Sequence, residues 1–140
     1  MTNAFKYLTS VLFAAIVVQV SFAGYGVFYA LHTAKHDHSA SVKTFDHGFG
    51  AHAALGSVIA VVILLLLVAA VAGRLGSSAI AWSGGLLVLA VLQFPFASLG
   101  RSVPALGFLH VVDALAIYAA AALLAHRAWT TGVGSPPTGA

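Results

Sequence analysis

The chain has 140 residues, of which 61% are hydrophobic and only 6% are charged, and it contains no cysteine. Soluble domains carry roughly a quarter charged residues, so this composition excludes a soluble globular protein and indicates one that lies in a lipid bilayer. Without cysteine, the chain has no disulfides, no thiolate metal sites and no covalent c-type haem attachment. The net charge of +3 rests on few charged side chains, so we do not expect nucleic-acid binding.

Four apolar segments are each long enough to cross a bilayer, which takes about 20 helical residues. We expect helices over residues 5–31, 47–73, 77–99 and 104–127, within one domain of residues 1–130. Pro104 suits the first turn of the last helix, and Pro95 should kink the third helix near its end. The Gly-, Pro- and Thr-rich tail, residues 131–140, is expected to be disordered. The predicted fold class is all-α, an integral membrane four-helix bundle.

Four spans place both termini on the same side of the membrane. The six Lys and Arg residues divide equally between the two sides, with Lys6, Arg74 and Arg127 on the terminal side and Lys35, Lys43 and Arg101 on the other. Because Lys6 and the amino terminus precede the first helix, we place the termini in the cytoplasm and the protein in the inner (plasma) membrane of a cell. Residues 21–23 resemble a signal-peptide cleavage site, but the apolar stretch continues to Ala30, so we expect this helix to be retained.

Two histidines, His52 and His110, lie within the second and fourth apolar segments. An ionisable side chain at membrane depth is costly, and it usually faces the interior of a bundle and has a function. With a rise of about 1.5 Å per residue, both histidines lie roughly 5–10 Å below the same membrane face. Two imidazoles complete a six-coordinate, low-spin haem iron, which favours electron transfer over oxygen chemistry. We therefore predict a haem b site with His52 and His110 as the axial ligands of the metal.

Two glycines flank these histidines. Gly56 follows His52 by one turn of helix. Gly107 precedes His110 by about one turn. These small residues predict space on both helices where a flat ring would lie, so we include both glycines in the cofactor site.

Polar residues near the same face complete the predicted site. Gln93 lies towards the histidine-bearing face, where it would reach a cofactor edge, whereas Gln19 lies deeper in the first helix. Arg101, together with Lys43 and Ser102, is expected to receive the haem propionates at the face that carries the long loop. We therefore assign Gln93 and Arg101 to the cofactor site and leave Gln19 out of it.

Asp113 follows His110 by three residues, so the two side chains are neighbours on one helix face. Asp113 is placed to accept the second ring N–H of His110, an arrangement that orients metal-ligating histidines. A neutral Asp113 that hydrogen-bonds to Gln93 or Ser98 across the helices fits the sequence equally well. Each buried histidine also has a purely structural interpretation, as a ring hydrogen-bonded to a backbone carbonyl or hydroxyl.

The segment between the first two helices, residues 32–47, is rich in histidine. His32 and His36 are four residues apart, which would bring them onto one face if the first helix ran on. A surface zinc or copper site with His38 is one interpretation, but lysines interrupt the cluster. We favour a solvated loop, and we interpret His47 as part of a cap before the second helix.

The motifs in helices two to four form a recognisable pattern: His52 and Gly56, Leu92-Gln93, Val103-Pro104-Ala105-Leu106-Gly107, Leu109-His110 and Asp113-Ala114-Leu115. The pattern resembles a family of small four-helix bacterial membrane proteins of uncharacterised function, and helices three and four carry its most specific part. More distantly, the layout resembles one half of heme A synthase, whose two four-helix halves each offer paired histidines to a haem. That resemblance implies that His52 and His110 occupy the ligand positions of helices two and four.

This chain departs from heme A synthase in having one half and no carboxylate in its first helix. The resemblance therefore implies haem binding and not catalysis. It also implies that two copies of this chain, as a homodimer, would correspond to the two halves of the enzyme. Our preferred interpretation is a haem b protein that passes electrons to a quinone or another redox partner in the lipid bilayer. The alternatives are a cofactor-free structural or accessory subunit of a membrane complex, and a haem-modifying enzyme or metal transporter. Asp113 is the only acidic residue at depth, which argues against a carboxylate-lined transport pathway.

Overall fold

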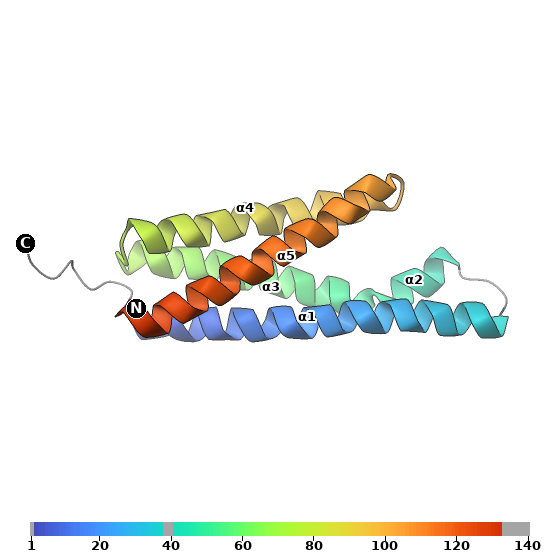
Figure 1. The fold of residues 1–140 in the computed structure, drawn as a ribbon, viewed down its shortest axis with the longest axis horizontal. Coiled ribbons are helices and arrows are strands. Elements are labelled where there is room, and N and C mark those ends of the chain that lie inside the picture. Colours follow the sequence, from blue (N-terminus) through green and yellow to red (C-terminus); the bar gives the residue numbers. More distant parts are fainter. Residues whose placement is uncertain (1, 38–40, 133–140) are drawn as a thin grey trace, which may run out of the picture. The chain divides into compact units, whose positions relative to one another are not determined.

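The structure, a computed structural model, describes residues 2–37 and 41–132. Within these ranges the regular elements are α1 (Thr2–Asp37), α2 (Val42–Gly48), α3 (Gly50–Ala72), α4 (Ser77–Gly100), α5 (Pro104–Arg127) and a π-helical turn (Ala128–Gly132) (Figure 1). Four of these helices, α1, α3, α4 and α5, are long and apolar enough to cross a membrane. The predicted all-α fold class with four membrane-spanning helices is confirmed.

The largest difference from the predicted boundaries lies after the first span. We expected the first helix to end at residue 31, but α1 continues to Asp37, and the predicted loop also contains the separate helix α2. Ser41 caps α2: its hydroxyl accepts a hydrogen bond from the Thr44 N–H at 3.3 Å, and the Ser41 N–H donates to the Thr44 hydroxyl at 3.3 Å. The predicted disordered tail lies, from residue 133 onwards, outside the described residues.

The chain divides into two compact units, each described here by itself. The smaller unit, residues 14–59, contains most of α1, all of α2 and the beginning of α3. The larger unit, residues 1–13 and 60–140, contains the beginning of α1, the rest of α3, and α4 and α5.

The core of the larger unit is made of apolar side chains from every helix that enters it. Phe5 and Leu12 of α1, Ile63 of α3 and Leu86 of α4 are almost completely buried. Large apolar side chains also cover the outer faces of the spans, where Val88 is 61% exposed and Leu115 is 63% exposed. Helices that are apolar on all sides are stable when the surrounding medium is itself apolar, as a bilayer is.

The connection between α3 and α4 is a tight turn of the Schellman type. The N–H of Arg74 donates to the Val71 carbonyl and the N–H of Leu75 donates to the Ala70 carbonyl, both at 3.0 Å. Arg74 adopts a positive φ of 50°, the conformation that usually selects glycine at this position. Leu75, which is buried, anchors the turn to the core of the larger unit.

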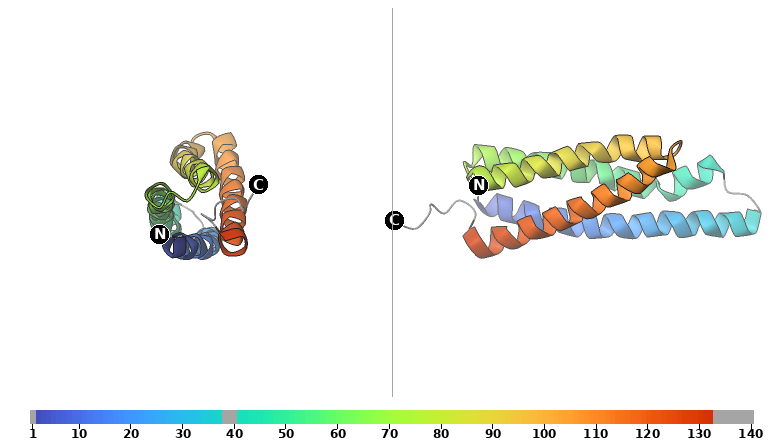
Figure 2. Two further views of the ribbon diagram at one scale, coloured as in Figure 1. Left: turned by 90° about the vertical axis from the view of Figure 1, so that its left-hand side faces the viewer. Right: turned by 45° about the horizontal axis from the view of Figure 1, so that its top comes forward.

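Helices α4 and α5 pack against each other and are joined by a short turn. They approach closely beside this turn, because a Cβ atom on Gly100 would lie only 2.8 Å from the Cα atom of Gly107. Towards their other ends the two helices diverge, as the views in Figure 1 and Figure 2 both show. Pro104 begins α5 as predicted, and Pro95 lies inside α4, which continues to Gly100.

Candidate functional site

Gln19 of α1 and His52 of α3, both in the smaller unit, contact each other through two hydrogen bonds. Gln19 Nε2 donates to the backbone oxygen of His52 at 2.9 Å, and His52 Nδ1 lies 3.1 Å from the backbone oxygen of Gln19. Because a carbonyl oxygen only accepts hydrogen bonds, Nδ1 is the ring nitrogen that carries the hydrogen in this contact. The neutral imidazole then has its ring lone pair on Nε2, the atom with which such a histidine binds a metal.

Gln93 of α4 and His110 of α5, both in the larger unit, make the same pair of contacts. Gln93 Nε2 donates to the backbone oxygen of His110 at 3.0 Å, and His110 Nδ1 lies 3.3 Å from the backbone oxygen of Gln93. Nδ1 is again the donor to a carbonyl. Both histidines therefore have the ring tautomer and the carbonyl contact that are typical of metal-ligating histidines.

The sequence around the two glutamines repeats as well. Residues 19–26 and 93–100 share the motif Q-x-x-F-A-x-x-G. The glycine that ends each segment is a point of close helix approach: a Cβ on Gly48 would lie 3.0 Å from the backbone oxygen of Gly26, and Gly100 lies against Gly107. The chain thus contains an internal repeat, in which a glutamine and a histidine join two helices in each copy. The glycine contact of the first copy lies between α1 and α2, and that of the second copy lies between α4 and α5.

The second helix pair also contains a buried carboxylate. The amide of Gln93 donates its second hydrogen to Asp113 Oδ2 at 2.6 Å, and Asp113 is only 7% exposed. Of the alternatives for Asp113, the hydrogen bond to Gln93 is confirmed, whereas Ser98 donates to the Pro95 carbonyl of its own helix. The corresponding position of the first pair, three residues after the histidine, is Leu55.

Gln19 is the residue that the sequence analysis placed wrongly. We expected it deeper than the histidines, but it lies level with His52 and binds it. Its side-chain oxygen Oε1 is buried and has no hydrogen-bond partner among the described residues. The repeated Q-x-x-F-A-x-x-G motif would have identified Gln19 from the sequence.

The two glycines assigned to the cofactor site are close to protein atoms rather than to open space. A Cβ on Gly56 would lie 3.0 Å from Gln19 Nε2, so this glycine makes room for the glutamine amide. Gly107 lies against Gly100, where the helix backbones meet. Contacts within the protein thus give both glycines an explanation that requires no flat ring, and their part in a cofactor site stays a prediction.

The other predicted site residues are distributed over both units. His52 belongs to the smaller unit and His110 to the larger one, so each is described with its own neighbours. Arg101 is exposed at the C-terminal end of α4, and Lys43 is exposed on α2. Within residues 2–37 and 41–132, no group of three or more His, Cys, Asp or Glu side chains is placed to hold a metal ion.

The histidines of the long connection have defined positions on α1 and α2. Because α1 runs on, His32 and His36 share a face as predicted, with ring centroids 4.4 Å apart. The ring of His47 lies 5.2 Å from that of Tyr29. His38, the third histidine of the predicted surface metal site, lies outside the described residues.

Comparison with known proteins gives one family. The sequence profile of a family of unknown function, DUF6220, matches residues 19–99, which are 81 of the 140 residues. The matched segment begins at Gln19 and includes His52 and Gln93, and it ends before α5, which carries His110 and Asp113. Neither the curated proteins nor the solved structures gave a match, so no comparison connects this chain with heme A synthase.

Proposed function

The chain belongs to the DUF6220 family, whose function is unknown, and we propose from its own residues that it is a membrane protein that binds haem b through His52 and His110. The observation that carries this proposal is the Nδ1–carbonyl contact, which occurs in both helix pairs. Such a contact holds the ring, selects the tautomer and makes Nε2 a better ligand. In both pairs, a histidine ring inside a membrane-spanning helix makes the same contact with a backbone carbonyl. Polar residues are costly at this depth, so the repetition of the contact indicates a function.

Each residue of the repeat has a part in this proposal. His52 and His110 are the axial ligands, and Gln19 and Gln93 hold the two rings in orientation through their backbone and amide groups. A haem iron with two imidazole ligands supplies one-electron transfer. We assign Arg101, with Lys43, to the haem propionates, because Arg and Lys form strong charge-assisted hydrogen bonds with carboxylates.

The proposed activity is electron transfer without catalysis of a further reaction, with a membrane quinone or a redox protein as partner. We place the protein in the inner (plasma) membrane, with both termini in the cytoplasm and a homodimer as the assembly. The distant resemblance to one half of heme A synthase supports the assignment of two histidine ligands. It lends no support to an enzymatic activity, because α1 has Gln19 at the level of His52, and its only acidic residue is the terminal Asp37, 18 residues away along the chain.

An absorption spectrum of the purified protein tests the proposal. Protein produced in cells supplied with a haem precursor should show a Soret band and, after reduction, sharp α and β bands of low-spin haem b. The variants His52→Ala and His110→Ala should each lose this low-spin spectrum. His36→Ala, which changes an exposed histidine of α1, is the matched control and should leave the spectrum unchanged.

The haem content and the ligand field make the test quantitative. A pyridine haemochrome assay should give one haem per chain, and the electron paramagnetic resonance spectrum should be that of an iron with two imidazole ligands. A colourless preparation from haem-replete cells contradicts the proposal, as does a low-spin spectrum that survives both histidine substitutions.

The same hydrogen bonds favour a second candidate, a cofactor-free structural or accessory subunit. Each glutamine–histidine contact joins two helices and satisfies the ring Nδ1 without a metal. This function predicts that His52→Ala lowers the stability of a colourless protein and weakens its association with a larger membrane complex. Co-purification of wild-type protein and of His52→Ala with their partners, each scored for bound haem, separates the two candidates.

A further inference from the structure

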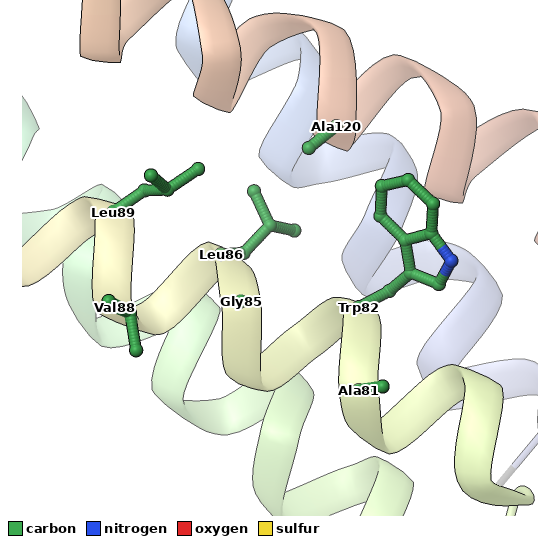
Figure 3. A pocket seen from close by; sticks show the side chains of 7 residues that line it. All are labelled: Ala81, Trp82, Gly85, Leu86, Val88, Leu89 and Ala120. Carbon is green, nitrogen blue, oxygen red and sulfur yellow. The ribbon is translucent and has the colours of Figure 1, made fainter.

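An apolar groove opens where α4 and α5 diverge from their glycine contact. Its volume is about 520 Å³, within the range of about 300–1,000 Å³ that is typical of ligand sites. The groove is lined by Ala81, Trp82, Gly85, Leu86 and Leu89 of α4 and by Ala120 of α5 (Figure 3). The side chains of Trp82, Leu86 and Leu89 extend from α4 towards α5, where Ala120 presents only a methyl group.

Two adjacent glycines of α4 have no packing explanation. Glycine is the least favourable helix residue after proline, so it is usually retained where another backbone approaches. A Cβ atom on Gly84 or on Gly85 would meet nothing within 4 Å, in contrast to one on Gly100. At Gly85, which lines the groove, the missing side chain keeps the groove open.

One end of the groove is positively charged. The guanidinium carbon of Arg127 lies 5.0 Å from the ring centroid of Trp82, which lines the groove. At the same end of this unit, Lys6 Nζ lies 5.6 Å from the centroid of the Trp129 ring. Cations beside tryptophan rings are typical of the boundary between hydrocarbon and headgroups.

The length of the groove matches one half of a bilayer. From Ala81 to Leu89 it follows α4 for about 12 Å at the helical rise, and one leaflet contributes about 15 Å to a hydrocarbon core of about 30 Å. A single acyl chain in this groove would have its headgroup at the Arg127 end. We propose that the groove binds one acyl chain of an anionic phospholipid, whose phosphate pairs with Arg127. This proposal is independent of haem binding.

Native mass spectrometry of the full-length protein tests the assignment, with phosphatidylglycerol and phosphatidylcholine of identical acyl chains as probes. Wild-type protein should retain phosphatidylglycerol about tenfold better than phosphatidylcholine, because both lipids carry the phosphate but the quaternary ammonium of phosphatidylcholine offsets the phosphate charge and is repelled by Arg127. Gly85→Leu fills the groove and should reduce retention of both lipids about tenfold, the loss expected when the acyl chain no longer fits. Gly84→Leu, whose Cβ also meets open space but lies outside the groove lining, is the matched control and should retain both lipids.

The variant Arg127→Gln tests the contribution of the positive charge separately from that of the apolar groove. It should bring the ratio of the two lipids close to one while the protein still retains them. Equal retention of both lipids by the wild type overturns the proposal, and so does a Gly85→Leu variant that binds like the wild type. A dimer that Gly85→Leu converts to a monomer, with no change in bound lipid, would instead make the groove a contact between copies of this chain. Helical content and melting temperature confirm the folding of each variant, and Gly85→Ala provides a milder change that should lose lipid in the same direction.

Discussion

The α1–α3 and α4–α5 pairs make the same glutamine–histidine contact in different surroundings. The partners are 33 residues apart in the first pair and 17 in the second, so the contact is the same whether the connection is long or short. In the first pair the glutamine amide donates to one backbone oxygen, and in the second it also donates to the buried Asp113. The comparison shows that the glutamine–histidine contact depends on the local sequence motif and not on the length of the connection. The hydrogen bond to Asp113 is an addition that only the α4–α5 pair has.

The largest expected difference concerns the glycine that ends each Q-x-x-F-A-x-x-G segment, Gly26 and Gly100. Gly100→Ala places a Cβ atom 2.8 Å from the Gly107 backbone, which is fixed within a helix, and should cost about 3 kcal/mol of unfolding free energy. Gly26→Ala meets the Phe49 ring at 2.8 Å, and a half-buried ring can turn away, so the cost should be about 1 kcal/mol. Denaturation in mixed micelles measures both, with Gly84→Ala as the control in open space. Equal losses of unfolding free energy from Gly100→Ala and Gly26→Ala would contradict the idea that a clash with backbone costs more than a clash with a movable ring.

The next effect concerns the two glutamines. Gln93→Leu removes a donor from the buried Asp113 carboxylate and should destabilise the protein by about 2 kcal/mol. Gln19→Leu breaks only the contact with His52 and should cost about 1 kcal/mol, the usual value for a polar contact between membrane helices.

A double-mutant cycle isolates the contribution of the carboxylate. Asp113→Leu gives the second pair the residue that the first pair has at Leu55. In the Gln93→Leu background it should recover at least half of the lost stability, because both polar partners are then replaced by apolar groups. Additive losses from the two substitutions would show that the 2.6 Å contact between Gln93 and Asp113 does not couple them.

The smallest effect is expected at the position four residues after each histidine, Gly56 in the first pair and Ala114 in the second. Gly56→Ala should displace the amide of Gln19, but the gain in helix propensity offsets part of the loss, leaving a net cost of about 0.5 kcal/mol. In the Gln19→Leu background the same substitution should become neutral or stabilising. A cost that persists without the glutamine would mean that another neighbour requires Gly56.

The four spans were predictable because each is an apolar run that exceeds the length needed to cross a bilayer. The extension of α1 was not, because polarity alone suggested a loop. Lys35 and His36 in fact lie in the last turn of α1, where cations interact favourably with the helix dipole, and the first helix-breaking glycine after them is Gly48.

The composition of the site was only partly predictable. Both histidines were predictable because an ionisable side chain within an apolar segment is costly and therefore conspicuous. The hydrogen bond between Gln93 and Asp113 was one of the expected alternatives across the helices. The pairing of Gln19 with His52 was missed, because depth counted along a single helix says nothing about how two helices are rotated and shifted against each other. The repeated Q-x-x-F-A-x-x-G motif indicates this pairing, because a contact between Gln93 and His110 in the second copy predicts one between Gln19 and His52 in the first.

The length of α1 gives a means of establishing which compartment each loop faces. Its 36 residues extend about 54 Å, well beyond a hydrocarbon core of about 30 Å, so α1 extends out of the core, and we expect its last turn, which contains Lys35 and His36, to do so together with α2. Because the chain has no cysteine, Val42→Cys on α2, where Val42 is 70% exposed, would be its sole thiol. A membrane-impermeant maleimide should label this variant in intact cells and label Ser77→Cys only after permeabilisation. The reverse pattern would place the termini outside the cell.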